Sequence, residues 1–190
     1  MLMYPIRQPV IDWDVVWDYT MGLPEDNGFT KTVIGNSPQA EIQQDGLQIT
    51  VALGTDYIRY EPTDYPTCNE GIWEIELSFA ELPSNGGVRM ILSDGEKGCQ
   101  IFIRSISGDG QYAVLYNAEN IQTQILSADP NVQYILRIER RNGYNTVYLN
   151  DAPIYESDIE SRDYTAGNRL FFQNSPIDAT LKSMKFKKIS

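Results

Sequence analysis

Two glutamates of this sequence, Glu74 and Glu76, have a spacing that suits carboxylate chemistry. They alternate with apolar residues in a strand-like segment, so both point to one face, roughly 6–7 Å apart. Glycoside hydrolysis uses two carboxylates about 5–5.5 Å apart in retaining enzymes and about 6.5–9.5 Å apart in inverting ones. The interpretation that we favour is a solvated strand face, with Arg89 or Arg104 as cross-strand ion partners. We therefore expect no catalytic residues.

The absence of histidine narrows the chemistry further. The chain has 190 residues and no histidine, which removes the Ser-His-Asp and Cys-His catalytic systems and every imidazole metal ligand. Only carboxylate, lysine, tyrosine or cysteine chemistry remains. Two cysteines, Cys68 and Cys99, are too few for a disulfide-dependent secreted scaffold, so we expect two free thiols, with a single bridge as the alternative.

A tyrosine-rich stretch, Gly54–Asn69, is the candidate ligand site. It lies outside the clearly alternating segments, and long loops on a rigid β scaffold are where binding tends to reside. It contains Tyr57, Tyr60 and Tyr65, with Asp64 beside the last of them. We expect these four residues to contact a glycan, because tyrosine rings stack on sugar rings and a carboxylate accepts hydrogen bonds from hydroxyls. The alternative is ordinary sheet packing, with the ring packed and the hydroxyl wet.

The rest of the chain predicts the scaffold that positions these residues. From about Ile42 onward, short alternating segments are separated by Gly, Asn, Asp and Pro clusters, which is the pattern of strands and turns. Trp73–Phe79 alternates without exception, and Tyr134–Leu149 predicts a hairpin. About ten to thirteen strands in one domain predict two packed antiparallel sheets. A phase slip near Ser183 predicts a β-bulge in the last strand.

The charge balance limits the partners. The chain has 15 basic and 26 acidic residues, a net charge of −11, which predicts no nucleic-acid partner and no attraction to anionic lipid. No run approaches the roughly 18 apolar residues of a membrane helix, and the first residues lack the pattern of a signal peptide. The last nine residues contain Lys182, Lys185, Lys187 and Lys188. They predict an edge strand guarded by lysines, with an electrostatic contact to an acidic partner subunit as the alternative.

The order of the strand-like segments carries a family resemblance. In chain order the segments are Phe29 and Leu47, Gly71–Phe79, Tyr134–Glu139, Val147–Asn150 and the closing strand Ala179–Ile189. Their spacing resembles a concanavalin A-like lectin/glucanase jelly roll, in particular its laminin G-like modules. The resemblance implies an all-β fold, an antiparallel two-sheet β-sandwich that forms a single domain over residues 12–190. Residues 1–11 are expected to form an N-terminal arm, and the first strand is expected within Trp13–Tyr19.

The resemblance also bears on catalysis and on metals. Glucanases of this superfamily carry their catalytic acids in a Glu-x-Asp-x-x-Glu pattern, whereas here Glu76 replaces the Asp and Phe79 replaces the last Glu. Lectins and laminin G-like members often hold calcium through loop oxygens. The available loop residues are Asp56, Asp64, Asn69, Asp94 and Asp109. We expect no metal site and no cofactor, with Ca²⁺ as the alternative.

Fold and composition together favour a non-enzymatic structural or binding module. We expect a bacteriophage virion component, such as a decoration, fibre-associated or baseplate-associated protein. It would be made in the host cytoplasm and would join other virion proteins, or copies of itself as a homo-oligomer. The alternative is a bacterial carbohydrate-binding lectin-like module at the cell surface or outside the cell. A third hypothesis is a glycoside hydrolase that uses Glu74 or Glu76.

Overall fold

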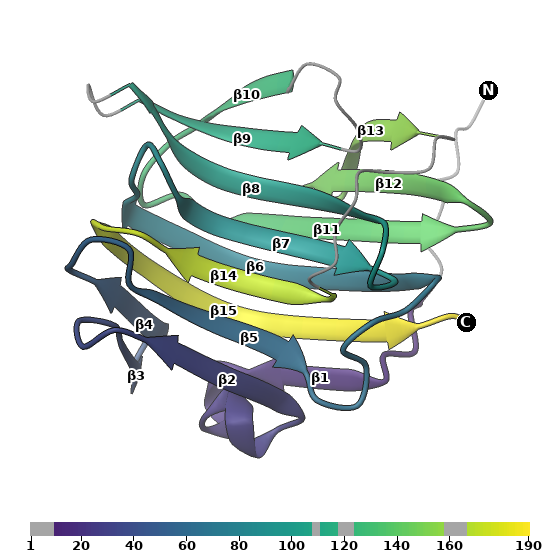
Figure 1. Cartoon of the computed structure of the whole chain (residues 1–190), viewed down its shortest axis with the longest axis horizontal. Coiled ribbons are helices and arrows are strands. Elements are labelled where there is room, and N and C mark those ends of the chain that lie inside the picture. The colour runs from purple at the N-terminus through teal and green to yellow at the C-terminus, as the bar shows by residue number, and fades with distance from the viewer. Residues whose placement is uncertain (1–9, 108–110, 118–123, 158–166) are drawn as a thin grey trace, which may run out of the picture.

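Two antiparallel sheets, packed face to face, form the molecule (Figure 1). The computed structural model describes residues 10–107, 111–117, 124–157 and 167–190. The eight-stranded sheet runs in the order β13 (Ala152–Ser157), β12 (Tyr144–Leu149), β11 (Tyr134–Arg141), β6 (Gly71–Glu81), β15 (Ile177–Lys188), β4 (Gly46–Val51) and β3 (Gln39–Gln43), and β1 (Val15–Asp18) also pairs with β15. The seven-stranded sheet runs in the order β10 (Gln124–Ala128), β9 (Gln111–Asn117), β8 (Gly98–Ser107), β7 (Gly87–Ser93), β14 (Arg169–Gln173), β5 (Tyr57–Pro62) and β2 (Phe29–Ile34).

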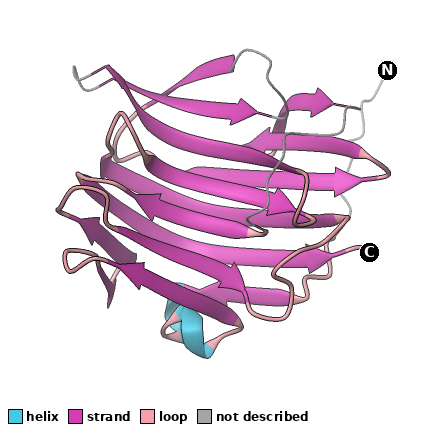
Figure 2. Cartoon of the chain, viewed as in Figure 1, coloured by secondary structure: helices cyan, strands magenta, loops and turns pink. Residues whose placement is uncertain are grey.

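Strands dominate the described residues, and the helical part consists of two short 3₁₀ helices, Tyr19–Met21 and Pro24–Asp26 (Figure 2). The predicted all-β, two-sheet antiparallel sandwich is therefore confirmed.

Strand β6 shows how alternation builds the core. Trp73, Ile75, Leu77 and Phe79 are each at most 1% exposed and pack between the sheets. Burying a side chain of this size contributes about 1.5–3 kcal/mol. The intervening glutamates point to the outer face of the eight-stranded sheet, as the sequence pattern predicts.

The last strand, β15, lies inside the eight-stranded sheet, so the edge-strand prediction is wrong. One side of β15 pairs with β6, and the other side pairs with β4 and then with β1. The predicted β-bulge is present beside Ser183. Two lysines of β15 form ion pairs within the chain: Lys185 Nζ lies 2.9 Å from Glu74, and Lys187 Nζ lies 2.9 Å from Asp14.

The N-terminal part of the domain follows the expected order. β1 lies within the predicted first-strand segment Trp13–Tyr19 and pairs with β15 from Val15 to Asp18. Residues 1–9 of the expected arm lie outside the described residues. No helix in the described residues has the length and apolar composition needed to cross a bilayer.

The predicted loop 54–69 contains a strand, which corrects the sequence analysis. β5 pairs with β14 on one side and with β2 on the other. Cys68 follows β5, and both it and Cys99 are buried and free, so the expectation of two thiols is confirmed. Burial raises the pKa of both thiols, that of Cys99 to about 12.

Candidate functional site

The outer face of the seven-stranded sheet gathers arginines and aromatic rings. Neighbouring side chains on this face are set by the registers of adjacent strands. We call the set the arginine–aromatic face: Tyr57 and Arg59 on β5, Arg169 and Phe171 on β14, Arg89 on β7, and Phe102 and Arg104 on β8. Four of the nine arginines of the chain lie in it.

One row of this face alternates arginine and phenylalanine across four strands. Arg59 pairs with Phe171, Phe171 with Arg89, and Arg89 with Phe102. Adjacent strands are about 4.8 Å apart, so the row spans roughly 14 Å. The guanidinium carbons of Arg89 and Arg104 lie 5.3 and 5.5 Å from the centroid of the Phe102 ring. The first tyrosine of β5 packs edge-on against Phe171, with ring centroids 5.9 Å apart. Such contacts hold the guanidinium groups and rings in fixed orientations.

Some polar atoms on this face are buried without a hydrogen-bond partner in the part of the chain that the structure describes. They include Nε of Arg59, Nε of Arg104 and Oε1 of Gln100. Gln100 pairs with Ile91 beside the row and is only 4% exposed. An unpartnered buried polar group costs about 1–3 kcal/mol, and native proteins contain few of them. These atoms are themselves withdrawn from solvent, so a ligand reaches the face through the half-buried arginines and Phe171.

A single carboxylate, Glu61, lies among the arginines. Its Oε2 is 2.8 Å from Arg59 Nη2, and its Oε1 is 2.9 Å from Arg169 Nε. Arg59 Nη2 also donates to Thr32 Oγ1 at 3.1 Å. Among the outward-pointing strand residues that the structure describes on this sheet, the charged ones are four arginines and Glu61. The face is therefore locally positive, although the chain has a net charge of −11.

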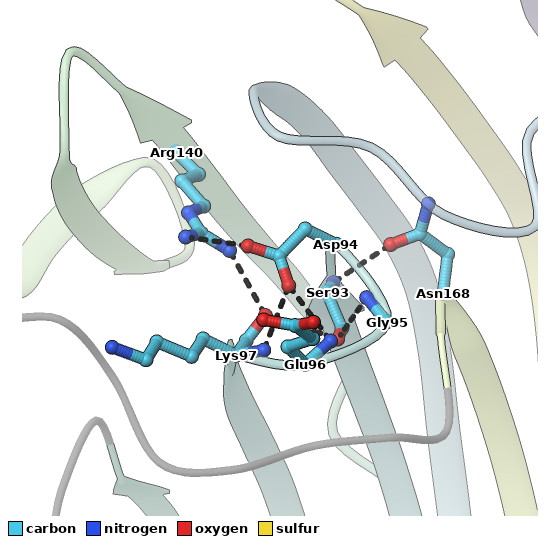
Figure 3. A network of polar contacts seen from close by, with 7 residues as sticks. All are labelled: Ser93, Asp94, Gly95, Glu96, Lys97, Arg140 and Asn168. Atoms are coloured by element: carbon cyan, nitrogen blue, oxygen red, sulfur yellow. Dashed lines mark hydrogen bonds and ion pairs between the residues drawn. The ribbon is translucent and has the colours of Figure 1, made fainter.

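The β7–β8 turn fixes the two strands that carry Arg89 and Gln100 (Figure 3). Asp94 Oδ1 accepts from the backbone amide of Lys97 at 2.7 Å, and Asp94 Oδ2 lies 3.1 Å from Arg140 of β11. Arg140 also donates to the carbonyl of Lys97, which ties the turn to the opposite sheet. Burial alone would raise the pKa of Asp94, but the amide hydrogen bonds and Arg140 outweigh it, so the pKa is lowered.

Glycine at the start of β7 allows this close pairing. Gly87 has φ +116°, and a Cβ there would lie 2.2 Å from the carbonyl oxygen of Ile103 on β8. Any side chain at this position would push β7 and β8 apart.

A cavity of about 370 Å³ lies next to the Arg104 end of the face. Arg104 Nη1 donates to the carbonyl of Ser84, one of its lining residues, at 3.0 Å. The lining consists of Glu81, Leu82, Pro83, Ser84, Asn85, Ser105, Tyr112, Ser175 and Pro176. This volume is within the range of about 300–1,000 Å³ that is typical of small-molecule sites.

The structure does not bring the four predicted ligand residues together. Tyr57 belongs to the arginine–aromatic face. Tyr60 is fully buried in the core, so it is inaccessible to a ligand, and desolvation raises the pKa of its hydroxyl. Tyr65 lies beyond the other end of β5 and stacks on Phe186, with ring centroids 5.6 Å apart. Asp64 is exposed in the same turn as Tyr65.

The candidate catalytic pair lies on the outer face of the other sheet. Both oxygens of Glu74 are engaged, Oε1 by Lys185 at 2.9 Å and Oε2 by Arg137 at 3.3 Å. Glu76 accepts a hydrogen bond from the side chain of Gln133. The arginines that the sequence suggested as partners belong to the seven-stranded sheet, so that pairing was wrong.

The candidate calcium ligands are dispersed or already bonded. Asp56 accepts from the hydroxyl and the amide of Ser37 at 2.8 and 3.1 Å, and these hydrogen bonds lower its pKa. Asp94 is occupied in the β7–β8 turn, and Asp109 lies outside the described residues. In the ranges described, no group of three or more His, Cys, Asp and Glu residues is placed to hold a metal ion.

Sequence reasoning missed the arginine–aromatic face because its members are far apart in the chain, from Tyr57 to Phe171. Each arginine stands between apolar or core residues, as Arg89 does between Val88 and Met90. The signal in the sequence was an arginine at an outward-pointing position on several strands. Only the strand order and register show that these arginines are neighbours.

Comparison with known proteins defines the fold. No family model and no curated protein matches the chain. An apo Crh5 transglycosylase is similar in structure, with TM-score 0.64, 13% identity, and coverage of 92% of this chain and 84% of that one. The carbohydrate-binding module CBM66 from Bacillus subtilis has TM-score 0.53, 13% identity and coverage of 85% and 96%. A Bacillus licheniformis β-glucanase has TM-score 0.57, 10% identity and coverage of 85% and 92%.

These neighbours confirm the concanavalin A-like β-sandwich fold. They include both enzymes and a binding module, so the fold by itself does not choose between the two activities.

Proposed function

We propose that the protein is a non-catalytic carbohydrate-binding module that holds saccharides against the arginine–aromatic face. The observation that carries the proposal is the row in which Arg59, Phe171 and Arg89 alternate across the outer face of the seven-stranded sheet. A sugar hydroxyl accepts hydrogen bonds from guanidinium N–H groups, so the arginines of this row suit a saccharide ligand. The half-buried Phe171 ring supplies apolar surface for the carbohydrate ring.

The engagement of the glutamates supports a non-catalytic role. Glycoside hydrolysis needs two carboxyl groups that face the same glycosidic bond. Glu74 is 11% exposed at its side chain and is held between two cations, and Glu76 is bonded to Gln133. Both side chains lie on the outer face of the eight-stranded sheet, away from the arginine–aromatic face.

The biological setting remains a proposal from the sequence. A glycan-binding face suits a virion component that attaches to a glycan-coated host, and it equally suits a bacterial surface lectin-like module. Light scattering gives the oligomeric state, and mass spectrometry of purified particles would detect a virion component. Absence from such particles, together with glycan binding by the isolated chain, would favour the bacterial module.

A glycan panel with two matched variants tests the proposal. Phe171→Ala removes a ring from the arginine–aromatic face. Tyr148→Ala removes a ring from the other sheet, where Arg137 lies 4.1 Å from the ring centroid. We expect Phe171→Ala to weaken binding by about tenfold, the upper end of a ring contact of about 0.5–1.5 kcal/mol. Tyr148→Ala should keep the wild-type affinity. Equal loss in both variants, or no binding by the wild type, would contradict the proposal.

A further inference from the structure

The cavity of about 370 Å³ lies at one end of the sandwich, where the chain crosses between the two sheets. Residues 82–85 connect β6 to β7, residues 174–176 connect β14 to β15, and both connections contribute lining residues. A hydrogen bond from Asn174 Nδ2 to the carbonyl of Asn85, at 2.6 Å, ties the two connections together. The cavity therefore has two walls that hold each other in place.

The inner side of the cavity is closed by the core. Ser105 and Tyr112 line it and stand opposite each other on β8 and β9. The Tyr112 ring packs against Phe79, with centroids 4.8 Å apart, and Phe79 is 1% exposed. A sugar chain cannot pass between rings packed at this distance, so a chain that enters the cavity does so by its end.

The charges around the cavity favour an uncharged ligand group. Glu81 is the single charged side chain among the described lining residues, and it is exposed, so its oxygens are available to a ligand. Asp178 stands opposite Glu81 on β15, and Arg104, which donates to the carbonyl of Ser84, balances part of the negative charge. A carboxylate accepts hydrogen bonds from sugar hydroxyls and repels a uronate.

The apolar part of the lining suits the body of a sugar ring. It consists of Leu82, Pro83 and Pro176, with the hydroxyl and amide groups of Ser84, Asn85 and Ser175 beside them. Small-molecule sites combine such apolar surface with a few polar groups that fix the orientation of the ligand.

Strand β14 leads from the arginine–aromatic face to the cavity. Phe171 and Gln173 occupy successive outward positions, both half-buried, and Ser175 follows two residues later in the lining. At about 3.3 Å per residue, Phe171 and Ser175 are roughly 13 Å apart. Gly86, next to the cavity wall, is so close to β14 that a Cβ there would lie 2.3 Å from the carbonyl oxygen of Gln173. The face and the cavity are thus neighbours along one path.

We infer that the cavity holds the terminal, uncharged residue of the glycan, so that the protein recognises chain ends. This inference rests on the proposed glycan-binding function of the arginine–aromatic face. Hydroxyls of the terminal residue donate to Glu81, and the following residues of the chain lie over Gln173 and Phe171.

Calorimetry with saccharides of increasing length tests the inference. The probes are linear gluco-, galacto-, manno-, xylo- and fructo-oligosaccharides and the long polymer of each series. In a series that binds, we expect one protein molecule per chain end at every length, with an affinity per chain end that no longer changes once the chain spans the path. Recognition of chain interiors would instead load more protein molecules onto a chain as its length grows.

Two glutamate variants locate the terminal residue. Glu81→Gln should weaken binding by about tenfold, because a neutral amide replaces the charged acceptor. Glu41→Gln is the matched control, since Glu41 is exposed on β3 at an edge of the other sheet, and it should keep the wild-type affinity. Both glutamates are exposed, so urea unfolding should give the wild-type free energy in each variant.

The outcomes separate this inference from the function on which it rests. A number of protein molecules that grows with chain length, or wild-type affinity in Glu81→Gln, would overturn the chain-end site and leave glycan binding intact. Tighter binding of glucosamine oligosaccharides than of every uncharged series would overturn the uncharged terminal residue in favour of an ammonium group. Absence of binding to all these probes would overturn both proposals.

Discussion

Replacing Gln100 with methionine should separate ligand binding from stability in a single variant. The side chain of Gln100 is buried on the arginine–aromatic face, and its Oε1 lacks a partner among the described residues. Methionine has nearly the same length and no acceptor oxygen. The substitution therefore removes an unsatisfied polar atom and leaves the packing of β8 in place.

The expected gain follows from the burial. At 4% exposure Gln100 is nearly withdrawn from water, and an unsatisfied buried acceptor costs about 1–3 kcal/mol. Methionine recovers part of this cost, so we expect the free energy of unfolding to rise by about 1 kcal/mol, with a Tm increase of about 2–4 °C for a chain of this length. Glycan affinity should stay at the wild-type value, because Oε1 of Gln100 is withdrawn from solvent and offers no contact to a ligand.

Gln48 on β4 provides the matched control for thermal and urea unfolding. Its Oε1 accepts from Thr180 at 2.9 Å and its Nε2 donates to Asp178, so both ends of the amide are bonded. Gln48→Met should lower the free energy of unfolding by about 1 kcal/mol and leave glycan binding unchanged. A destabilised Gln100→Met would refute the conclusion that Oε1 of Gln100 is an unsatisfied buried acceptor.

Three other predictions concern the scaffold. Asp94→Asn should lower the free energy of unfolding by about 2 kcal/mol at pH 7, because it weakens the bonds to the turn amides and to Arg140. The folded-state pKa of Asp94 is lowered, so its contribution to stability is present above about pH 4 and is lost as the pH falls through that lowered pKa. Urea unfolding at several pH values from neutral to acid tests this. The same dependence of the free energy of unfolding on pH in the wild type and in Asp94→Asn would count against it. Cys68 and Cys99 should resist alkylation at pH 8 in the native protein and both react in denaturant, since burial raises their pKa values; mass spectrometry would expose a disulfide by the absence of two labels. Glu74→Gln should destabilise by about 3 kcal/mol, because it leaves two cations without their carboxylate, and calorimetry that finds no loss would contradict the ion-pair geometry.

The fold was largely predictable because alternation and turn residues act locally. Trp73–Phe79 identifies its inward face from the residue types alone, and the phase slip beside Ser183 marks a real bulge. β5 was missed because tyrosines occupy both of its faces: Tyr57 points outward and Tyr60 inward. With equal residue types on both faces, the period-2 signal disappears.

Features that depend on which strands are neighbours could not be predicted from the sequence. The lysines of β15 have the composition of a protected edge, yet Lys185 is neutralised by Glu74, more than a hundred residues earlier, and the strand is interior. The arginine–aromatic face arises in the same way, because Arg59, Phe171 and Arg89 become neighbours only through the order β5–β14–β7. The local sequence of each strand does not specify the order of the strands in the sheet.

Nuclear magnetic resonance of the arginine side chains tests the central claim most directly. The Nε–H groups of Arg59 and Arg104 lie on this face, and each gives its own signal in a ¹⁵N spectrum. During titration with a saccharide that the protein binds, we expect these two signals to shift and Arg141 to stay in place. Shifts confined to the eight-stranded sheet, with the Arg59 and Arg104 signals unchanged at saturation, would contradict the location of the glycan site.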